Sequence, residues 1–297
     1  MSVLAKIKRG GEGLPPRTIL AGPEGIGKST FAANAPAPLF VSQEDGLTGL
    51  DHVARVYPES FGEILALCDE LAKAPKSDFE TLVIDTVDWL ERAIHAYICK
   101  RDNKQGIEDY GYGKGYKVAE QELVSLLTKL DALRHGKRMG IILLSHVHIR
   151  TFSDPAGETW DRYEMKGHKG FTGILREWPD ACLFATYEVF KTKERGETRE
   201  RTIGGERIIH TTWSPGWDAK NRLALPETLP LEYDAYALAV RENSPSQLRD
   251  RFLALLKSAE MPEADKKKWA ANDPATVPAD RLKAGIAKLE AMQPKTK

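Results

Sequence analysis

Long hydrophobic runs are missing from this sequence, and cysteine is scarce. The longest apolar stretch, around Ile141 to Leu144, is far short of the roughly 20 residues that a membrane-spanning helix needs. The first residues show no signal-peptide pattern. The three cysteines, Cys68, Cys99 and Cys182, are odd in number, widely spaced and without a CxxC pair, which argues against a zinc site and a disulfide framework. We therefore expect a soluble, cytosolic protein.

An excess of charge of either sign is also lacking. Lys and Arg together number 43, as do Asp and Glu, so the formal net charge is zero. The chain as a whole therefore makes no electrostatic case for a polyanionic partner, and any contact with nucleic acid has to be local. Internal repeats and low-complexity tracts are not evident in the sequence.

Apolar runs alternate with segments of helical length along the first two thirds of the chain. The expected strands are 18–21, 39–42, 81–85, 139–146 and 181–190, and the expected helices are 28–34, 60–73, 87–101 and 116–134. This alternation predicts an α/β fold with a mostly parallel central sheet flanked by helices. After Ala181 a strand, a charged turn at 193–200 and a strand near 207–213 predict antiparallel edge strands.

The last 55 residues look like a separate unit. Ser244 and Pro245 make a helix start, and Leu248, Phe252 and Leu255 form a single apolar stripe. We expect an N-terminal segment at 1–16, an α/β core at 17–231, a linker at 232–242 and a small helical C-terminal domain at 243–297. The best candidate for linker sequence is the Pro-rich segment 226–230.

A phosphate-binding loop is the strongest motif of the chain. Residues 22–29 match GxxxxGK followed by serine, directly after an apolar strand and before a helical segment, which is the context that this motif requires. The predicted ATP-binding residues are Gly22, Pro23, Glu24, Gly25, Ile26, Gly27, Lys28, Ser29 and Thr30. Backbone N–H groups and the positive end of the helix face the phosphates, Lys28 reaches the terminal phosphates, and Ser29 is a ligand of Mg²⁺.

Two strand ends carry acids that suit a phosphate-transfer site. Asp85 ends the apolar strand 81–85, where P-loop proteins hold the magnesium shell; the alternative is a helix N-cap. Glu44 and Asp45 end the strand that follows the loop helix, so a carboxylate there would orient and deprotonate the attacking water. The alternative at this second position is a polar turn around Gly46.

His146 follows a buried strand at the edge where open α/β sheets place their ligands. It is either a sensor of the γ-phosphate or a satisfied core histidine. No HxxxH and no paired His/Cys spacing supports a catalytic metal beyond magnesium.

In this order the motifs resemble those of RecA-like P-loop ATPases, and most closely phage-encoded ATP-binding proteins of single-strand annealing and recombination. The resemblance covers about Arg17 to Leu231. It implies that the catalytic glutamate falls on Glu44 and that the polar switch residue, commonly glutamine, falls at Ser145–His146, where this sequence has histidine. If a phage encodes the chain, the cytosol is that of the host.

The resemblance also implies a site shared between subunits. Asp218 to Arg222 looks like the Lys-x-Arg turn that hexameric RecA-like helicases insert into a neighbour's nucleotide site, so that Lys220 and Arg222 would act in trans on transition-state charge. Lys191 and Lys193 are an alternative pair for that role. The alternative is an exposed basic turn with no role in a neighbouring subunit's site.

Two loops correspond in order to the DNA-facing loops of RecA-like proteins. The first, 103–117, mixes rings with cations among glycines, and the second, 149–169, follows the strand of His146 and is rich in basic residues. The candidate DNA-binding residues are Tyr110, Tyr112, Lys114, Lys117, Lys166 and Lys169. Because acids dilute both loops, a solvated loop is the alternative.

Together these features predict an ATPase that hydrolyses ATP with Mg²⁺ and forms homo-oligomers, as rings or filaments, on single-stranded DNA. Its expected role is annealing or strand pairing in phage or mobile-element recombination, with a single-strand-binding protein as a further candidate partner and no membrane. One rival is a P-loop small-molecule kinase, for which neither an arginine-rich lid nor an acceptor pocket is clear. The other is a module that binds nucleotide as an assembly switch without turnover.

Overall fold

The fold is known from a computed structural model, which describes residues 13–42, 46–47, 49–154, 157–192, 201–259, 261–270 and 277–292. The chain divides into two units. The core unit comprises Pro15–Arg222 and Pro226–Tyr236, and the helical unit comprises Met1–Leu14, Leu223–Leu225 and Ala237–Lys297. None of the helices in the described ranges is both long and apolar enough to cross a membrane.

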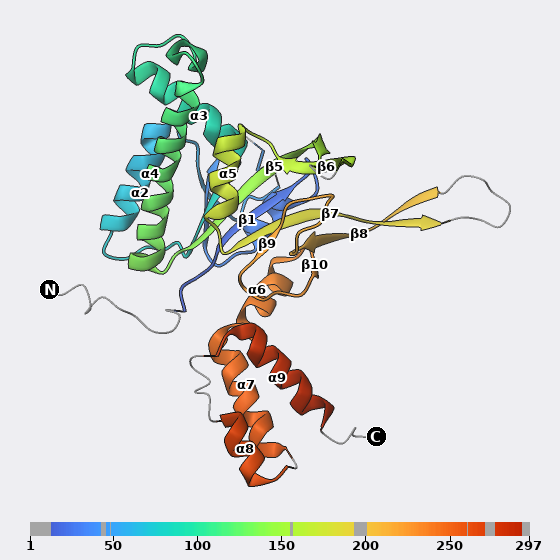
Figure 1. Ribbon diagram of the computed structural model, residues 1–297. Coiled ribbons are helices and arrows are strands. Elements are labelled where there is room, and N and C mark those ends of the chain that lie inside the picture. Colours follow the sequence, from blue (N-terminus) through green and yellow to red (C-terminus); the bar gives the residue numbers. More distant parts are fainter. Residues whose placement is uncertain are drawn as a thin grey trace. The chain divides into compact units, whose positions relative to one another are not determined.

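A ten-stranded sheet runs through the described part of the core unit (Figure 1). Its strands are β1 (Arg17–Gly22), β2 (Pro38–Ser42), β3 (Ala54–Val56), β4 (Thr81–Asp85), β5 (Gly140–Ser153), β6 (Thr159–Met165), β7 (Ala181–Thr192), β8 (Arg201–His210), β9 (Lys220–Asn221) and β10 (Thr228–Pro230). Along the sheet the order is β10-β8-β7-β1-β5-β4-β2-β3, with β6 beside β5 and β9 beside β7. The β3-to-β7 part is parallel and β6, β8, β9 and β10 pair antiparallel. The predicted α/β fold, with a mostly parallel central sheet, flanking helices and antiparallel edge strands, is therefore confirmed.

Helices cover the sheet because their apolar residues recur at helical spacing. The helices of the core unit are α1 (Lys28–Ala33), α2 (Phe61–Lys73), α3 (Val87–Arg101), the short 3₁₀-helix η2 (Ile107–Tyr110), α4 (Lys114–Lys137) and α5 (Lys169–Glu177). In α4 the residues Ala119, Leu123, Leu126, Leu130 and Leu133 are buried, which is the stripe of a one-sided amphipathic helix. Figure 1 shows α2, α3, α4 and α5 together beside the sheet, and they share one apolar cluster with the strands.

The structure corrects the expectation of two long loops. Residues 103–117 contain η2 and the first turn of α4, so Lys117 is helical. Within residues 149–169, the described strand residues belong to a hairpin in which Val147–Ser153 of β5 pairs with Thr159–Met165 of β6. In β6 the buried residues are Arg162 and Met165, so the burial follows no clear period of two, and the density of charged residues conceals the strand.

The segment expected as a linker is instead packed structure. Helix α6 spans Tyr233–Glu242, and the Pro-rich segment before it contributes β10. Within the core unit the rings of Tyr233 and Tyr236 pack on Phe31, and the hydroxyl of Tyr236 lies 2.6 Å from that of Thr18. Buried aromatic rings of this size stabilise the fold, which explains why these residues do not form a free tether.

The helical unit has an apolar core of its own. It contains α7 (Pro245–Ser258), α8 (Glu263–Ala270) and α9 (Ala279–Ala291). Phe252 and Leu256 of α7 pack in one cluster with Leu282, Ile286 and Leu289 of α9. A Cβ at Gly285 would lie 2.9 Å from the ring of Phe252, so the close contact of the two helices depends on glycine at this position.

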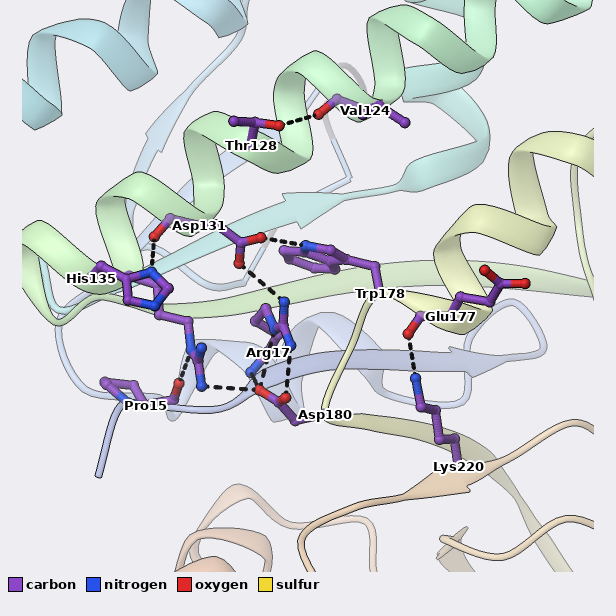
Figure 2. Close-up of polar contacts among 11 residues, drawn as sticks. Pro15, Arg17, Val124, Thr128, Asp131, His135, Glu177, Trp178, Asp180 and Lys220 are labelled. Atoms are coloured by element: carbon purple, nitrogen blue, oxygen red, sulfur yellow. Dashed lines mark hydrogen bonds and ion pairs between the residues drawn. The ribbon is translucent and has the colours of Figure 1, made fainter. Parts of the chain in front are cut away.

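A polar network joins the strands at the edge of the sheet opposite to the strands' carboxyl ends (Figure 2). The carboxylate of Asp180 accepts hydrogen bonds from the backbone N–H of Arg17 at 3.0 Å, from its guanidinium at 2.9 and 3.3 Å, and from Arg134 at 3.2 Å. Asp131 of α4 accepts from Arg17 and from the indole N–H of Trp178. Burial opposes ionisation of Asp180, but the hydrogen bonds and charge of Arg17 outweigh it and lower the pKa of this carboxyl.

Candidate nucleotide-binding site

The phosphate loop lies at the carboxyl edge of the sheet, between the end of β1 and the start of α1. Two glycines meet close neighbours there. A Cβ at Gly22 would lie 2.8 Å from the carbonyl oxygen of Ala185 in β7, and Gly27, at φ 110°, has the left-handed backbone that favours glycine. Neither position accommodates a side chain, so the motif's glycines are required by the fold itself.

Lys28 is buried inside the loop. Its side chain is 6% exposed, and its ammonium donates hydrogen bonds to the carbonyl oxygens of Gly22 at 2.9 Å and Pro23 at 2.8 Å. Burial lowers the pKa of Lys28, while the charges of Asp85, Glu24 and Asp88 oppose that change. The ammonium is therefore held within the loop, surrounded by oxygen atoms.

Ser29 and Asp85 form a direct pair. The hydroxyl of Ser29 donates to a carboxylate oxygen of Asp85 at 2.7 Å. One strand, β5, separates β1 from β4, and the register places Ser42, Asp85 and His146 near the same edge as Gly22. The alternative interpretation of Asp85 as a helix N-cap does not hold, because Thr86 is the N-cap of α3.

His146 is anchored by a carboxylate that the sequence did not single out. Its Nδ1 lies 3.2 Å from both carboxylate oxygens of Asp88, which begins the buried face of α3. Burial opposes ionisation of Asp88, but the hydrogen bond and charge of His146 lower its pKa to about 2. In the sheet His146 is paired with Gly22, so its backbone lies next to the first residue of the phosphate loop. Asp88 stands three residues after Asp85, in the first turn of α3, and this closeness in sequence to Asp85 was a signal for it.

The structure does not test every predicted catalytic residue. Glu44 and Lys193 lie outside the described residues. Lys220 and Asn221 form β9 beside the first residues of β7, at the opposite edge of the sheet. There the ammonium of Lys220 donates to the carbonyl oxygens of Arg176 and Glu177 at the end of α5, as Figure 2 shows for Glu177.

The predicted DNA-binding residues fall into two groups. Three have partners inside the protein: the hydroxyl of Tyr110 donates to Ile98 and Asp102, Lys117 pairs with Glu120, and Lys166 lies 3.6 Å from Glu24 of the phosphate loop. The others are Tyr112, which is fully exposed at a positive φ of 49°, Lys114 at the start of α4, and Lys169 at the start of α5.

Arg207 is a residue of this site that sequence reasoning missed. It lies in β8, and its guanidinium donates to the carbonyl oxygen of Ile26 at 3.4 Å. The same guanidinium is 2.7 Å from the place of a Cβ on Gly27. Arg207 also lines a cavity of about 500 Å³ together with Tyr187 and Leu231. No motif connects it with a loop 181 residues earlier in the chain.

Comparison with known proteins agrees with this geometry. The family model described as "AAA domain" matches residues 14–223. The chain belongs to the AAA domain family. The matched residues of this AAA domain contain the phosphate loop, Asp85, Asp88, His146 and Arg207, and they end before β10 and the C-terminal helices.

Among solved structures, one described as "Crystal structure of the RadB recombinase" is similar to this AAA domain protein, with 16% identity and a TM-score of 0.41, over 75% of this chain and 91% of that chain. No curated protein matches the sequence.

Proposed function

We propose that this AAA domain protein is an ATPase that assembles on single-stranded DNA and promotes annealing or strand pairing in phage or mobile-element recombination. The observation that carries the nucleotide part is the pair of Ser29 and Asp85 beside the buried ammonium of Lys28. The hydroxyl of Ser29 and the carboxylate of Asp85 meet beside the phosphate loop. Both are hard oxygen ligands of the kind that Mg²⁺ prefers. When bound, the magnesium ion neutralises charge on the ATP phosphates.

The residues of the chain then have distinct roles in ATP binding and hydrolysis. Backbone N–H groups of residues 22–30 hold the phosphates, and Lys28 exchanges its two carbonyl partners for phosphate oxygens. Glu44 orients and deprotonates the attacking water. His146, fixed in orientation by Asp88, responds to the terminal phosphate.

The trans role of the basic turn belongs to the same proposal. Lys220 is occupied by the carbonyl oxygens at the end of α5, so Arg222 is the stronger candidate for a cation that enters a neighbouring subunit's site. Both lie at the edge of the sheet opposite their own phosphate loop. Such an arrangement fits a ring or a filament, in which that edge of one subunit faces the carboxyl edge of the next.

The first prediction concerns the DNA dependence of turnover. We expect the purified protein to release phosphate from ATP several-fold faster with a single-stranded oligonucleotide, because assembly on DNA completes the shared site. Steady-state phosphate release measures this, and mass photometry with nucleotide and oligonucleotide measures assembly. Equal rates together with a monomeric mass contradict the recombination role. Nucleotide binding without phosphate release favours the assembly switch, and transfer of phosphate to a small acceptor favours the kinase.

The second prediction concerns Arg207. Replacing it with alanine removes a charged donor from the carbonyl of Ile26 and leaves the phosphate loop less firmly placed. Because a hydrogen bond to a charged group contributes about 1.5 to 3 kcal/mol, we expect the Kd for ATP to rise about tenfold. Isothermal titration calorimetry measures this change.

Arg241→Ala is the matched control for that experiment, since it removes an exposed arginine of the helical unit. Arg207→Lys is expected to give an intermediate Kd. An unchanged Kd for ATP in Arg207→Ala would show that Arg207 does not contribute to nucleotide binding.

A further inference from the structure

Helix α3 and the segment before α2 enclose a groove of about 840 Å³ in the core unit. The α3 residues that carry the argument are Trp89, Arg92, Ala93, Ala96, Tyr97 and Lys100. They stand at positions i, i+3, i+4, i+7, i+8 and i+11, which is one face of a helix. The opposite face of α3 is buried in the core through Leu90, Ile94 and Ile98.

Along the groove, an aromatic residue followed three residues later by a basic residue occurs twice. Trp89 is followed by Arg92, and Tyr97 is followed by Lys100. Eight residues separate the two rings, and eight separate the two cations, so each pair is roughly 12 Å apart along the helix axis. Between these two occurrences, Ala93 and Ala96 are small, which leaves room above the helix for a planar group.

Arg92 and Lys100 are the groove cations that carry the argument. The guanidinium of Arg92 lies over the ring of Trp89 at 4.5 Å from the ring centroid. Among the described residues, no carboxylate lies within ion-pair distance of Arg92 or Lys100. Arg101 differs, because its guanidinium is paired with Asp102 and Glu122. Glu59 is the acid among the groove residues, so the positive charge of Arg92 and Lys100 exceeds it.

We propose that this groove binds single-stranded nucleic acid, with bases against Trp89 and Tyr97 and phosphates at Arg92 and Lys100. The proposal rests on the DNA-directed function proposed above and assigns that function a surface. Rings placed between cations match a strand in which bases and phosphates alternate. A duplex keeps its bases stacked inside, so the two rings would have no base to contact.

An acidic peptide fits the same surface less well. The wall formed by α3 offers side chains alone, because the backbone N–H and C=O groups in a helix interior are bonded within the helix. An extended peptide therefore finds no sheet edge here for main-chain hydrogen bonds. Recognition of carboxylates by charge requires cations alone, so an acidic peptide gives the two aromatic rings no role.

The test uses the full chain and a fluorescent oligo(dT), with affinity measured by anisotropy over a series of salt concentrations. Trp89→Ala is expected to weaken binding about tenfold, since base stacking contributes about 1 to 3 kcal/mol per base. Trp89→Phe is expected to retain most of the affinity. In the double variant Arg92→Ala with Lys100→Ala, the slope of log K against log salt is expected to fall by roughly 0.7 for each lost phosphate contact.

The matched control is the double variant Lys76→Ala with Arg241→Ala, which removes the same charge from exposed positions outside the groove. Unfolding temperatures verify that every variant is folded. If the wild type binds oligo(dT) and the groove variants bind as the control does, the groove is not the nucleic-acid surface, and the proposed function stands.

Two other outcomes also overturn the proposal. If the wild type binds ATP but no oligo(dT), the DNA-directed function fails, and the groove loses its ligand with it. If a fluorescent Glu/Tyr copolymer binds the wild type, loses affinity in Trp89→Ala, and oligo(dT) affinity is unchanged in that variant, the groove is a site for acidic peptides.

Discussion

Replacing Lys28 with alanine is expected to lower the rate of ATP hydrolysis by about 10²- to 10³-fold. The ammonium is buried, and the two carbonyl oxygens that hold it belong to the loop that receives the phosphates. A cation fixed in a water-poor site stabilises developing negative charge more than one in bulk water does, because little solvent screens it. Alanine has no charge, and its side chain is too short to extend to the phosphates.

Phosphate release at saturating ATP and magnesium measures this loss. Lys73→Ala is the control, since it removes an exposed lysine at the end of α2 and should retain wild-type turnover. A Lys28→Ala protein with wild-type turnover would locate hydrolysis outside this loop. If calorimetry with magnesium registers no ATP uptake even by the folded wild type, the nucleotide site itself is refuted.

Replacing Asp180 with alanine is expected to reduce the free energy of unfolding by about 3 to 5 kcal/mol. Its carboxylate is 15% exposed and bridges Arg17 to Arg134. Removing one member of a buried charge pair leaves the opposite charges without compensation, which costs more than the pair itself contributes. Urea denaturation followed by circular dichroism measures the change.

The control for Asp180 is Asp51→Ala. Asp51 is 95% exposed and lies 3.9 Å from Arg55, and exposed pairs of this kind contribute about 0 to 1 kcal/mol. A loss in Asp180→Ala no larger than in Asp51→Ala would show that the network does not stabilise the core unit.

Acid should remove the difference between wild type and Asp180→Ala. The pKa of Asp180 is lowered in the folded protein, so its carboxylate stabilises the fold above the unfolded-state pKa of about 3.9. That contribution is lost as the pH falls through the lower folded-state pKa. The two unfolding free energies are therefore expected to converge below about pH 4 and to differ most near neutrality.

The site residues that can be predicted from the sequence belong to local sequence patterns. Lys28 and Ser29 belong to one contiguous motif, and Asp85 ends a single apolar strand, so each was recognisable without knowledge of its neighbours. The strand order then brings Ser29 and Asp85 into contact across β5. Residues whose role depends on pairing across the sheet left no such pattern, and Arg207 is the clearest case, because β8 reaches the loop only through the fold.

The fold was misjudged where polar composition concealed packing. The β5–β6 hairpin carries many charged residues, which favour the prediction of a loop, yet the side chain of Arg162 in β6 is buried against Asp218. The sequence around Tyr233 and Tyr236 predicts a linker, yet their rings pack on Phe31. In both cases distant partners in the sequence decided the structure, and no window of neighbouring residues contains that information.

Helix α3 begins two residues after Asp85 and extends about 22 Å, given 15 residues at 1.5 Å each. Under the two proposals above, this one helix would carry Asp88 beside the nucleotide site and Lys100 in the nucleic-acid groove. Thermodynamic linkage then requires that whatever factor ATP applies to the affinity for a DNA strand, the strand applies to the affinity for ATP.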